Sequence, residues 1–232
     1  MPPRPLLHTA HVPAGNGPLP TLVLLHGWGA SAHDLIGLAP LIHRGQAQVF
    51  CPQGTVELAL GSSISGYGWF PLVPDRSPDP VAVNEEIERL VQFLDEALAR
   101  YQVDPARLVI GGFSQGGVMA YELALRTPER FSGLLAVSTW LPDTAIPAGA
   151  DADPLSGLPV LIVHGRSDPR VPVERAREAR EALRGLGVAL TYREVDMGHE
   201  INREALQLIA RWIDERAFSP RAGAAAGDTA AF

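Results

Sequence analysis

The chain contains no lysine, a single cysteine and no long apolar run. Because all 19 basic residues are arginine, mechanisms that need a lysine Schiff base or a P-loop lysine are excluded. Cys51 alone can form neither an intramolecular disulfide framework nor a thiolate metal cluster, and we expect it to be a small buried side chain. No segment approaches the roughly 18 apolar residues of a membrane-spanning helix.

The net charge of −7 argues against nucleic-acid binding, which needs a clustered basic face. With 46% hydrophobic and 19% charged residues in 232, the composition is typical of one soluble globular domain. The N-terminus lacks the apolar core of a signal peptide. We therefore expect a cytoplasmic protein with no stable membrane association.

Strand and helix patterns alternate along the chain. Apolar runs predict strands over 21–25, 48–51, 107–110, 133–138, 159–163 and 190–195, and helical patterns cover 31–42, 80–101, 115–126, 174–184 and 201–217. Strands this apolar are buried on both faces, so the sequence predicts an α/β fold with a mostly parallel twisted sheet and helices on both faces. We expect one domain over 1–217, a long excursion over 52–80 and a disordered tail over 218–232.

One apolar strand runs directly into a G-x-S-x-G pattern and then into a helix. Gly112 and Gly116 flank Ser114 at the positions where strand and helix would cross closely. A serine on such a turn has its hydroxyl exposed above the sheet, where a base and a carbonyl can both reach it. The bare pattern is only moderately specific, so the nucleophile hypothesis depends on whether a base and its carboxylate partner lie further along the chain.

A nucleophilic serine needs a base, and His199 is the best placed of the seven histidines. It follows the last predicted strand, at the carboxyl edge of the sheet where open α/β folds keep their sites. Asp168 follows the strand before it and is the candidate partner of His199, although a turn aspartate before proline is the alternative. Asp196 and Asp143 compete for that role, and His26 and His164 are expected to be structural.

A tetrahedral intermediate also needs hydrogen-bond donors for its oxyanion. Two backbone amides follow strands at the expected places: Gln115, directly after the candidate nucleophile, and Trp28, in the loop after the first predicted strand.

Together these motifs resemble the phospholipase/carboxylesterase family, which includes acyl-protein thioesterases and small bacterial carboxylesterases. The resemblance covers about residues 20–215 and rests on four segments: 25–29 (LHGWG), 112–117 (GFSQGG), 164–172 (HGRSDPRVP) and 198–200 (GHE). It implies an α/β-hydrolase fold without a large lid domain, Ser114, Asp168 and His199 as triad, and Trp28 and Gln115 as oxyanion donors. Trp28 and Ala30 depart from the leucine and aspartate usual in the family, which leaves the substrate open.

Aromatic and apolar residues on loops at the expected active-site edge suggest an apolar binding site. For each of them, core packing is the alternative. The candidate substrate-binding residues are Trp69, Phe70, Leu72, Trp140 and Leu141.

The sequence thus predicts hydrolysis of small carboxylic esters with short to medium acyl chains, without metal or cofactor. Activity should rise with pH as His199 loses its proton. Alternatives are an acyl-thioesterase or lysophospholipase on the same fold, a small peptidase, and a binding protein that uses the pocket without turnover. The resemblance is compatible with a homodimer.

Overall fold

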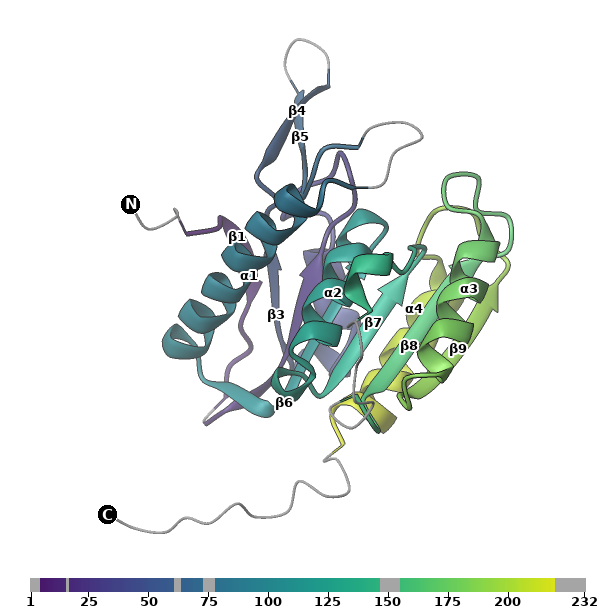
Figure 1. Ribbon diagram of the computed structural model, residues 1–232. Coiled ribbons are helices and arrows are strands. Elements are labelled where there is room, and N and C mark those ends of the chain that lie inside the picture. The colour runs from purple at the N-terminus through teal and green to yellow at the C-terminus, as the bar shows by residue number, and fades with distance from the viewer. Residues whose placement is uncertain (1–4, 16, 61–63, 73–77, 147–154, 220–232) are drawn as a thin grey trace.

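The computed structural model describes residues 5–15, 17–60, 64–72, 78–146 and 155–219. Its centre is a seven-stranded sheet in the order β1-β3-β2-β6-β7-β8-β9 (Figure 1). Strand β1 is antiparallel to β3, and all other neighbours are parallel. The strands are β1 (His8–His11), β2 (Leu19–Leu25), β3 (Gln48–Pro52), β6 (Val103–Phe113), β7 (Gly133–Val137), β8 (Pro159–Gly165) and β9 (Ala189–Val195).

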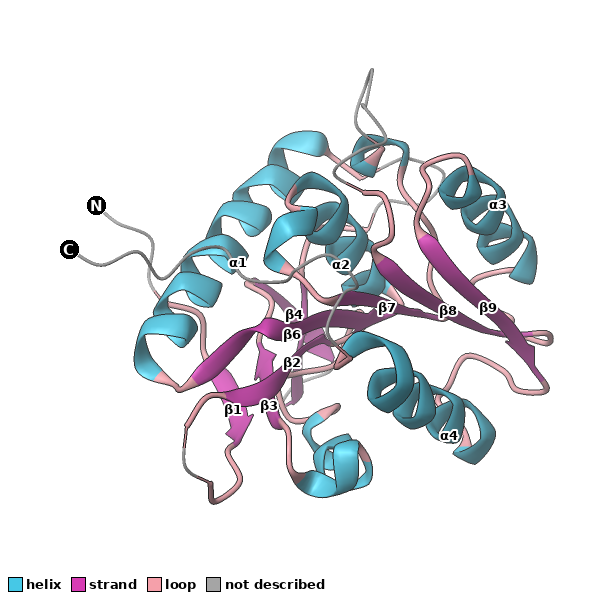
Figure 2. Ribbon diagram, turned by 90° about the horizontal axis from the view of Figure 1, so that it is seen from below, coloured by secondary structure: helices cyan, strands magenta, loops and turns pink. Residues whose placement is uncertain are grey.

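Helices cover both faces of the sheet (Figure 2). One face carries α1 (Pro80–Arg100), α2 (Gln115–Arg126) and α3 (Val173–Arg184), and the other carries α4 (Arg203–Trp212) and the 3₁₀ helix η1 (Ile36–Leu41). Each face has its own hydrophobic core. The fold class expected from the sequence, a mostly parallel α/β sheet covered on both faces, is confirmed.

Several elements begin and end where the sequence predicts. Helix α2 has the predicted bounds, and α1 begins at the predicted cap, where the Asp79 side chain accepts a hydrogen bond from the Val81 N–H at 3.0 Å. Pro80 occupies the first turn of α1, where its missing N–H costs nothing.

The predicted helix over 31–42 is wrong. Only the 3₁₀ helix η1 forms there, with Gly37 and Pro40 inside it. The Ser31 hydroxyl accepts a hydrogen bond from the His33 N–H at 3.2 Å, which closes a local turn instead of capping an α-helix.

The sequence also misses three strands. These are β1 and the hairpin of β4 (Val56–Leu60) and β5 (Ile64–Gly68), which lies inside the predicted excursion and projects from the body of the molecule (Figure 1). The final helix is interrupted: α4 ends at Trp212 and a π-helical turn follows over Ile213–Ala217. Phe218, predicted to begin the tail, is buried and packs edge-on against His43 at 5.2 Å. Residues 220–232 of that predicted tail lie outside the described residues.

Parallel topology determines where a site can form. Strands β2, β6, β7, β8 and β9 point the same way, so the segments that follow them meet along one edge of the sheet. Those segments carry Trp28, Ser114, Trp140, Asp168 and His199.

Candidate active site

Ser114 occupies a sharp turn between β6 and α2, with φ at +53°. A non-glycine residue in this region costs about 1–3 kcal/mol and persists only where its surroundings hold it. A Cβ at Gly112 would lie 2.1 Å from the Gly116 carbonyl oxygen, so the strand and helix approach each other as closely as the flanking glycines permit. The Thr139 hydroxyl donates to the Ser114 carbonyl at 2.7 Å and fixes the turn from the side of β7.

Asp168 and His199 are directly paired. The His199 Nδ1–H donates to Asp168 Oδ2 at 2.8 Å, while Oδ1 accepts the backbone N–H groups of Arg170 and Val171 at 2.9 Å each. Burial raises the pKa of Asp168, but hydrogen bonds from Val171, His199 and Arg170 outweigh it and hold the pKa below its usual value. The carboxylate is therefore ionised, and it leaves the His199 Nε2 available as a base.

The His199 ring lies beside the Ser114 turn. Its centroid is 4.7 Å from the ring of Phe113, the residue directly before Ser114. The structure thus brings Ser114, Asp168 and His199 to one edge of the sheet. Asp168, rather than Asp196 or Asp143, is the partner of the imidazole.

The two candidate oxyanion donors also lie at this edge. Gln115 is the first residue of α2, where the N–H has no partner within the helix and the helix dipole favours negative charge. Across the described residues, neither the Trp28 nor the Gln115 backbone N–H has a hydrogen-bond acceptor. Both donors are therefore free for a ligand.

The Gln115 side chain has a separate role in the architecture. It is buried, its Oε1 accepts the Trp69 N–H at 2.8 Å, and its Nε2 donates to the Phe70 carbonyl at 2.6 Å. Trp69 and Phe70 are themselves completely buried in the core, the alternative that the sequence left open, and they are absent from the lining of the cavity beside α2. These two hydrogen bonds connect the segment of Trp69 and Phe70 to the start of α2.

His26 links this segment to the loop that carries Trp28. Its Nδ1–H donates to the Gly27 carbonyl at 2.8 Å and its Nε2 accepts the Gly54 N–H at 3.0 Å, while its own carbonyl accepts the Trp69 indole N–H at 2.8 Å. Burial lowers the pKa of His26, so the ring is held neutral in one tautomer. These contacts agree with the structural role expected for it.

The hairpin missed by the sequence supports the same loop. Gly29 N–H donates to the Tyr67 carbonyl at 2.9 Å, and Tyr67 N–H donates to the Ala30 carbonyl at 2.8 Å. A Cβ at Gly66 would lie 2.3 Å from the Gly29 carbonyl oxygen, and one at Gly68 would lie 2.4 Å from the Trp28 ring. Alternating glycines in a strand are a signal for close backbone approach that could have located this contact.

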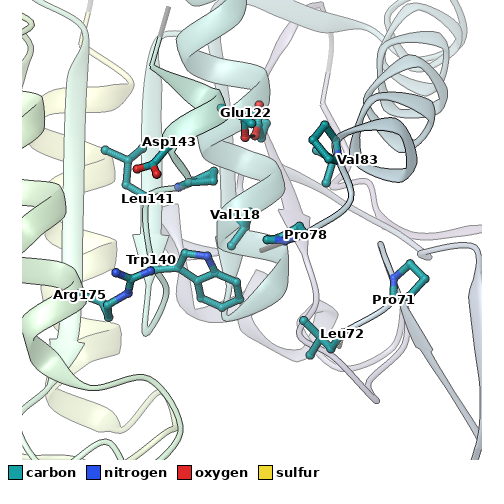
Figure 3. Close-up of a pocket in the computed structure, with 13 residues that line it drawn as sticks. Pro71, Leu72, Pro78, Val83, Val118, Glu122, Trp140, Leu141, Asp143 and Arg175 are labelled. Atoms are coloured by element: carbon teal, nitrogen blue, oxygen red, sulfur yellow. Dashed lines mark hydrogen bonds between the residues drawn. The ribbon is translucent and has the colours of Figure 1, made fainter. Parts of the chain in front are cut away.

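A cavity of about 560 Å³ lies next to α2 (Figure 3). It takes in three predicted substrate-binding residues, Leu72, Trp140 and Leu141. The sequence missed Val118 and Glu122, which follow Ser114 on the same helix at i+4 and i+8, a spacing that could have revealed them. The other lining residues are Pro71, Pro78, Pro80, Val83, Pro142, Asp143, Thr144 and Arg175.

Within the ranges that the structure describes, no group of three or more His, Cys, Asp or Glu side chains is placed to hold a metal ion. Over the same ranges, no helix is both long and apolar enough to cross a bilayer.

The sequence profile of the phospholipase/carboxylesterase family matches residues 9–216. The chain belongs to this family. Among similar curated proteins, acyl-protein thioesterase 1 of Gibberella zeae is 28% identical over 222 residues, which span 87% of this chain and 92% of that protein. Putative esterase NocK of Nocardia uniformis subsp. tsuyamanensis is 30% identical over 155 residues, 67% of this chain and 42% of its own length.

Solved structures of similar fold agree with this membership of the phospholipase/carboxylesterase family. The crystal structure of esterase PE8 superposes with a TM-score of 0.75 at 26% identity and covers 92% of this chain and 100% of that one. The Bacillus cereus carboxylesterase gives a TM-score of 0.76 over 90% of this chain and 93% of its own; at 24% identity it shows the fold alone. The chain is therefore an α/β-hydrolase and an enzyme of the carboxylic ester hydrolase class.

Proposed function

We propose that this enzyme hydrolyses small carboxylic esters of short to medium acyl chain through an acyl-enzyme on Ser114. The observation that carries the proposal is the 2.8 Å bond between His199 Nδ1 and Asp168 Oδ2 beside the Ser114 turn. His199 Nε2 would take the proton from the Ser114 hydroxyl as Oγ attacks the ester carbonyl. The free N–H groups of Trp28 and Gln115 would stabilise the oxyanion.

The imidazolium then gives its proton to the leaving alkoxide, and the acyl group remains on Ser114. A water molecule, activated by the same imidazole, releases the acid and restores the serine. Ionised Asp168 supports both steps because it stabilises the positive charge on His199.

The cavity beside α2 supports the proposed acyl-chain length. Glu122 lies eight residues beyond Ser114, about 12 Å along the helix axis. An extended chain built from C–C bonds of about 1.5 Å advances roughly 1.3 Å per carbon, so about nine carbons reach the level of Glu122. There Glu122 is ion-paired with Arg126 at 2.5 Å and accepts a hydrogen bond from the Thr144 hydroxyl, which makes this end of the cavity unfavourable for methylenes.

A series of p-nitrophenyl esters from acetate to palmitate tests this proposal. We expect kcat/KM to rise with each added carbon up to about nine, because each buried methylene contributes about 0.8 kcal/mol, and then to fall. The blank is Ser114→Ala, which has no nucleophile. A steady rise to palmitate would contradict the proposed chain length, and turnover by the blank would contradict the proposed nucleophile.

An acyl-thioesterase activity is the second candidate, because two similar proteins, from Gibberella zeae and Mycosarcoma maydis, are named acyl-protein thioesterase 1. Matched oxygen esters and thioesters of octanoate separate the two. We expect the oxygen ester to give the higher kcat/KM relative to its uncatalysed rate, and the reverse order would favour the thioesterase. A homodimer and a cytoplasmic location stay predictions.

A further inference from the structure

His164 is a buried histidine that the proposed mechanism does not use. It lies near the end of β8, is completely buried, and its Nε2 is 2.8 Å from the Val171 carbonyl oxygen. A carbonyl can only accept, so Nε2 carries the proton and Nδ1 has a lone pair. Within the described part of the chain, Nδ1 is buried without a hydrogen-bond partner.

Val171 connects this histidine to the proposed triad. The backbone N–H of Val171 donates to Asp168 Oδ1 at 2.9 Å, and its carbonyl accepts from His164. Asp168 is followed directly by Pro169, in a short turn that returns to β8 at Val171. His164 is therefore a side chain of β8 that connects this turn to the sheet.

The imidazole of His164 also lies close to the carboxylate of Asp168. His164 Nε2 is 3.7 Å from Asp168 Oδ2, the oxygen that accepts from His199 Nδ1. At that distance the two atoms are close neighbours without a hydrogen bond between them. The charged groups at this point are Asp168 on the loop after β8 and, once protonated, His199 on the loop after β9.

We propose that His164 is a positioning residue for Asp168. By binding the Val171 carbonyl, it holds the turn that presents Asp168 Oδ2 to His199. The inference rests on the proposed function, because Asp168 matters for catalysis only if His199 is the base.

Replacing His164 by Leu and by Gln tests the inference. Leucine fills much of the same space without a donor, whereas the glutamine amide can still donate to Val171. We expect His164→Leu to lower kcat about 10- to 100-fold with little change in KM, because small misplacements of a catalytic group have effects of this size. The acid limb of its pH–rate profile should move to lower pH, since a poorly held Asp168 stabilises protonated His199 less. His164→Gln should keep kcat within about threefold of the unmodified enzyme.

Ile162→Ala is the matched control, because Ile162 is also buried on β8 but its side chain has no group that could hydrogen-bond to Val171. It should lower thermal stability without moving the pH profile. Rates of the His164 and Ile162 variants are divided by the concentration of sites titrated with a fluorophosphonate, so unfolded protein does not count, and the rate of Ser114→Ala is divided by total protein. An unmoved pH profile in His164→Leu, or an equal loss in His164→Gln, would overturn the inference. Activity retained by Ser114→Ala would instead overturn the proposed function.

Discussion

Replacing Asp168 by Asn is expected to lower kcat about 1,000- to 10,000-fold while the fold stays intact. The two backbone N–H groups of Arg170 and Val171 require an acceptor at the Oδ1 position, so the asparagine oxygen will stay there. Its NH₂ group then faces His199 Nδ1, which has to accept instead of donate. The imidazole proton moves to Nε2, and the ring can no longer take a proton from Ser114.

The same substitution should change how stability depends on pH. Because the folded-state pKa of Asp168 is lowered, its ionised form contributes stability above the ordinary carboxyl range, and this is lost as the pH falls through the lowered pKa. Urea unfolding of the enzyme and of Asp168→Asn should therefore differ at neutral pH and converge in acid.

Asp196→Asn is the control, since this carboxylate competed for the role in the sequence and does not line the cavity beside α2. It should keep kcat within about threefold of the unmodified enzyme. Substantial activity in Asp168→Asn, or a large loss in Asp196→Asn, would show that another carboxylate orients His199.

Gly165→Ala is expected to lower kcat about 100-fold or more and to destabilise the fold by about 3 kcal/mol. A Cβ at this position would lie 2.3 Å from the Met197 carbonyl oxygen and 2.4 Å from that of Gly198. Both are backbone atoms, so no side chain can rotate away to make room. The loop that carries His199 has to move, and His199 moves away from both Asp168 and Ser114.

Gly37→Ala is the matched control for this prediction. Among the described residues, a Cβ built at Gly37 has no heavy atom within 4 Å apart from its chain neighbours and its own helix backbone, so this methyl group meets open space. Steady-state kinetics and thermal unfolding of both variants give the comparison. If Gly165→Ala retained the activity of the control, the close approach of the loop to β8 would not be needed for catalysis.

Local sequence was sufficient to predict the strands whose residues are apolar throughout. The apolar strands β2, β7 and β8 were predictable because each is buried on both faces of a parallel sheet. The order of Ser114, Asp168 and His199 along the chain then indicated one edge of that sheet, since residues after successive parallel strands meet there. The pairing of His199 with Asp168 was predictable for the same reason, because these residues follow the neighbouring parallel strands β9 and β8.

The spacing of the apolar residues explains why the predicted α-helix over 31–42 does not form. Its apolar stripe, Leu35, Leu38 and Leu41, repeats every three residues, which matches the 3.0-residue turn of a 3₁₀ helix better than the 3.6-residue turn of an α-helix. The structure forms a 3₁₀ helix over Ile36–Leu41.

Long-range contacts account for the other differences. The Gln115 side chain hydrogen-bonds to the backbone of Trp69 and Phe70 from more than forty residues away. The local sequence around the two aromatic residues does not indicate this contact. The hairpin of β4 and β5 likewise pairs with the loop at Gly29 and Ala30, and its alternating glycines signal a close approach without identifying the partner. The sequence around His164 is that of an ordinary strand end, and its hydrogen bond with Val171 is visible only in the folded structure.

The central claim is that Ser114 carries the acyl group, and the sequence makes a direct test available. Trypsin cleaves after Arg107 and Arg126 and releases a peptide in which Ser114 is the only serine. The only other hydroxyl in that peptide belongs to Tyr121, which is buried and whose pKa is raised by burial. After reaction with a p-nitrophenyl alkylphosphonate, mass spectrometry should find one phosphonyl group on Ser114 in this peptide and none in Ser114→Ala. An adduct on another peptide, or inhibition without any adduct, would contradict the account.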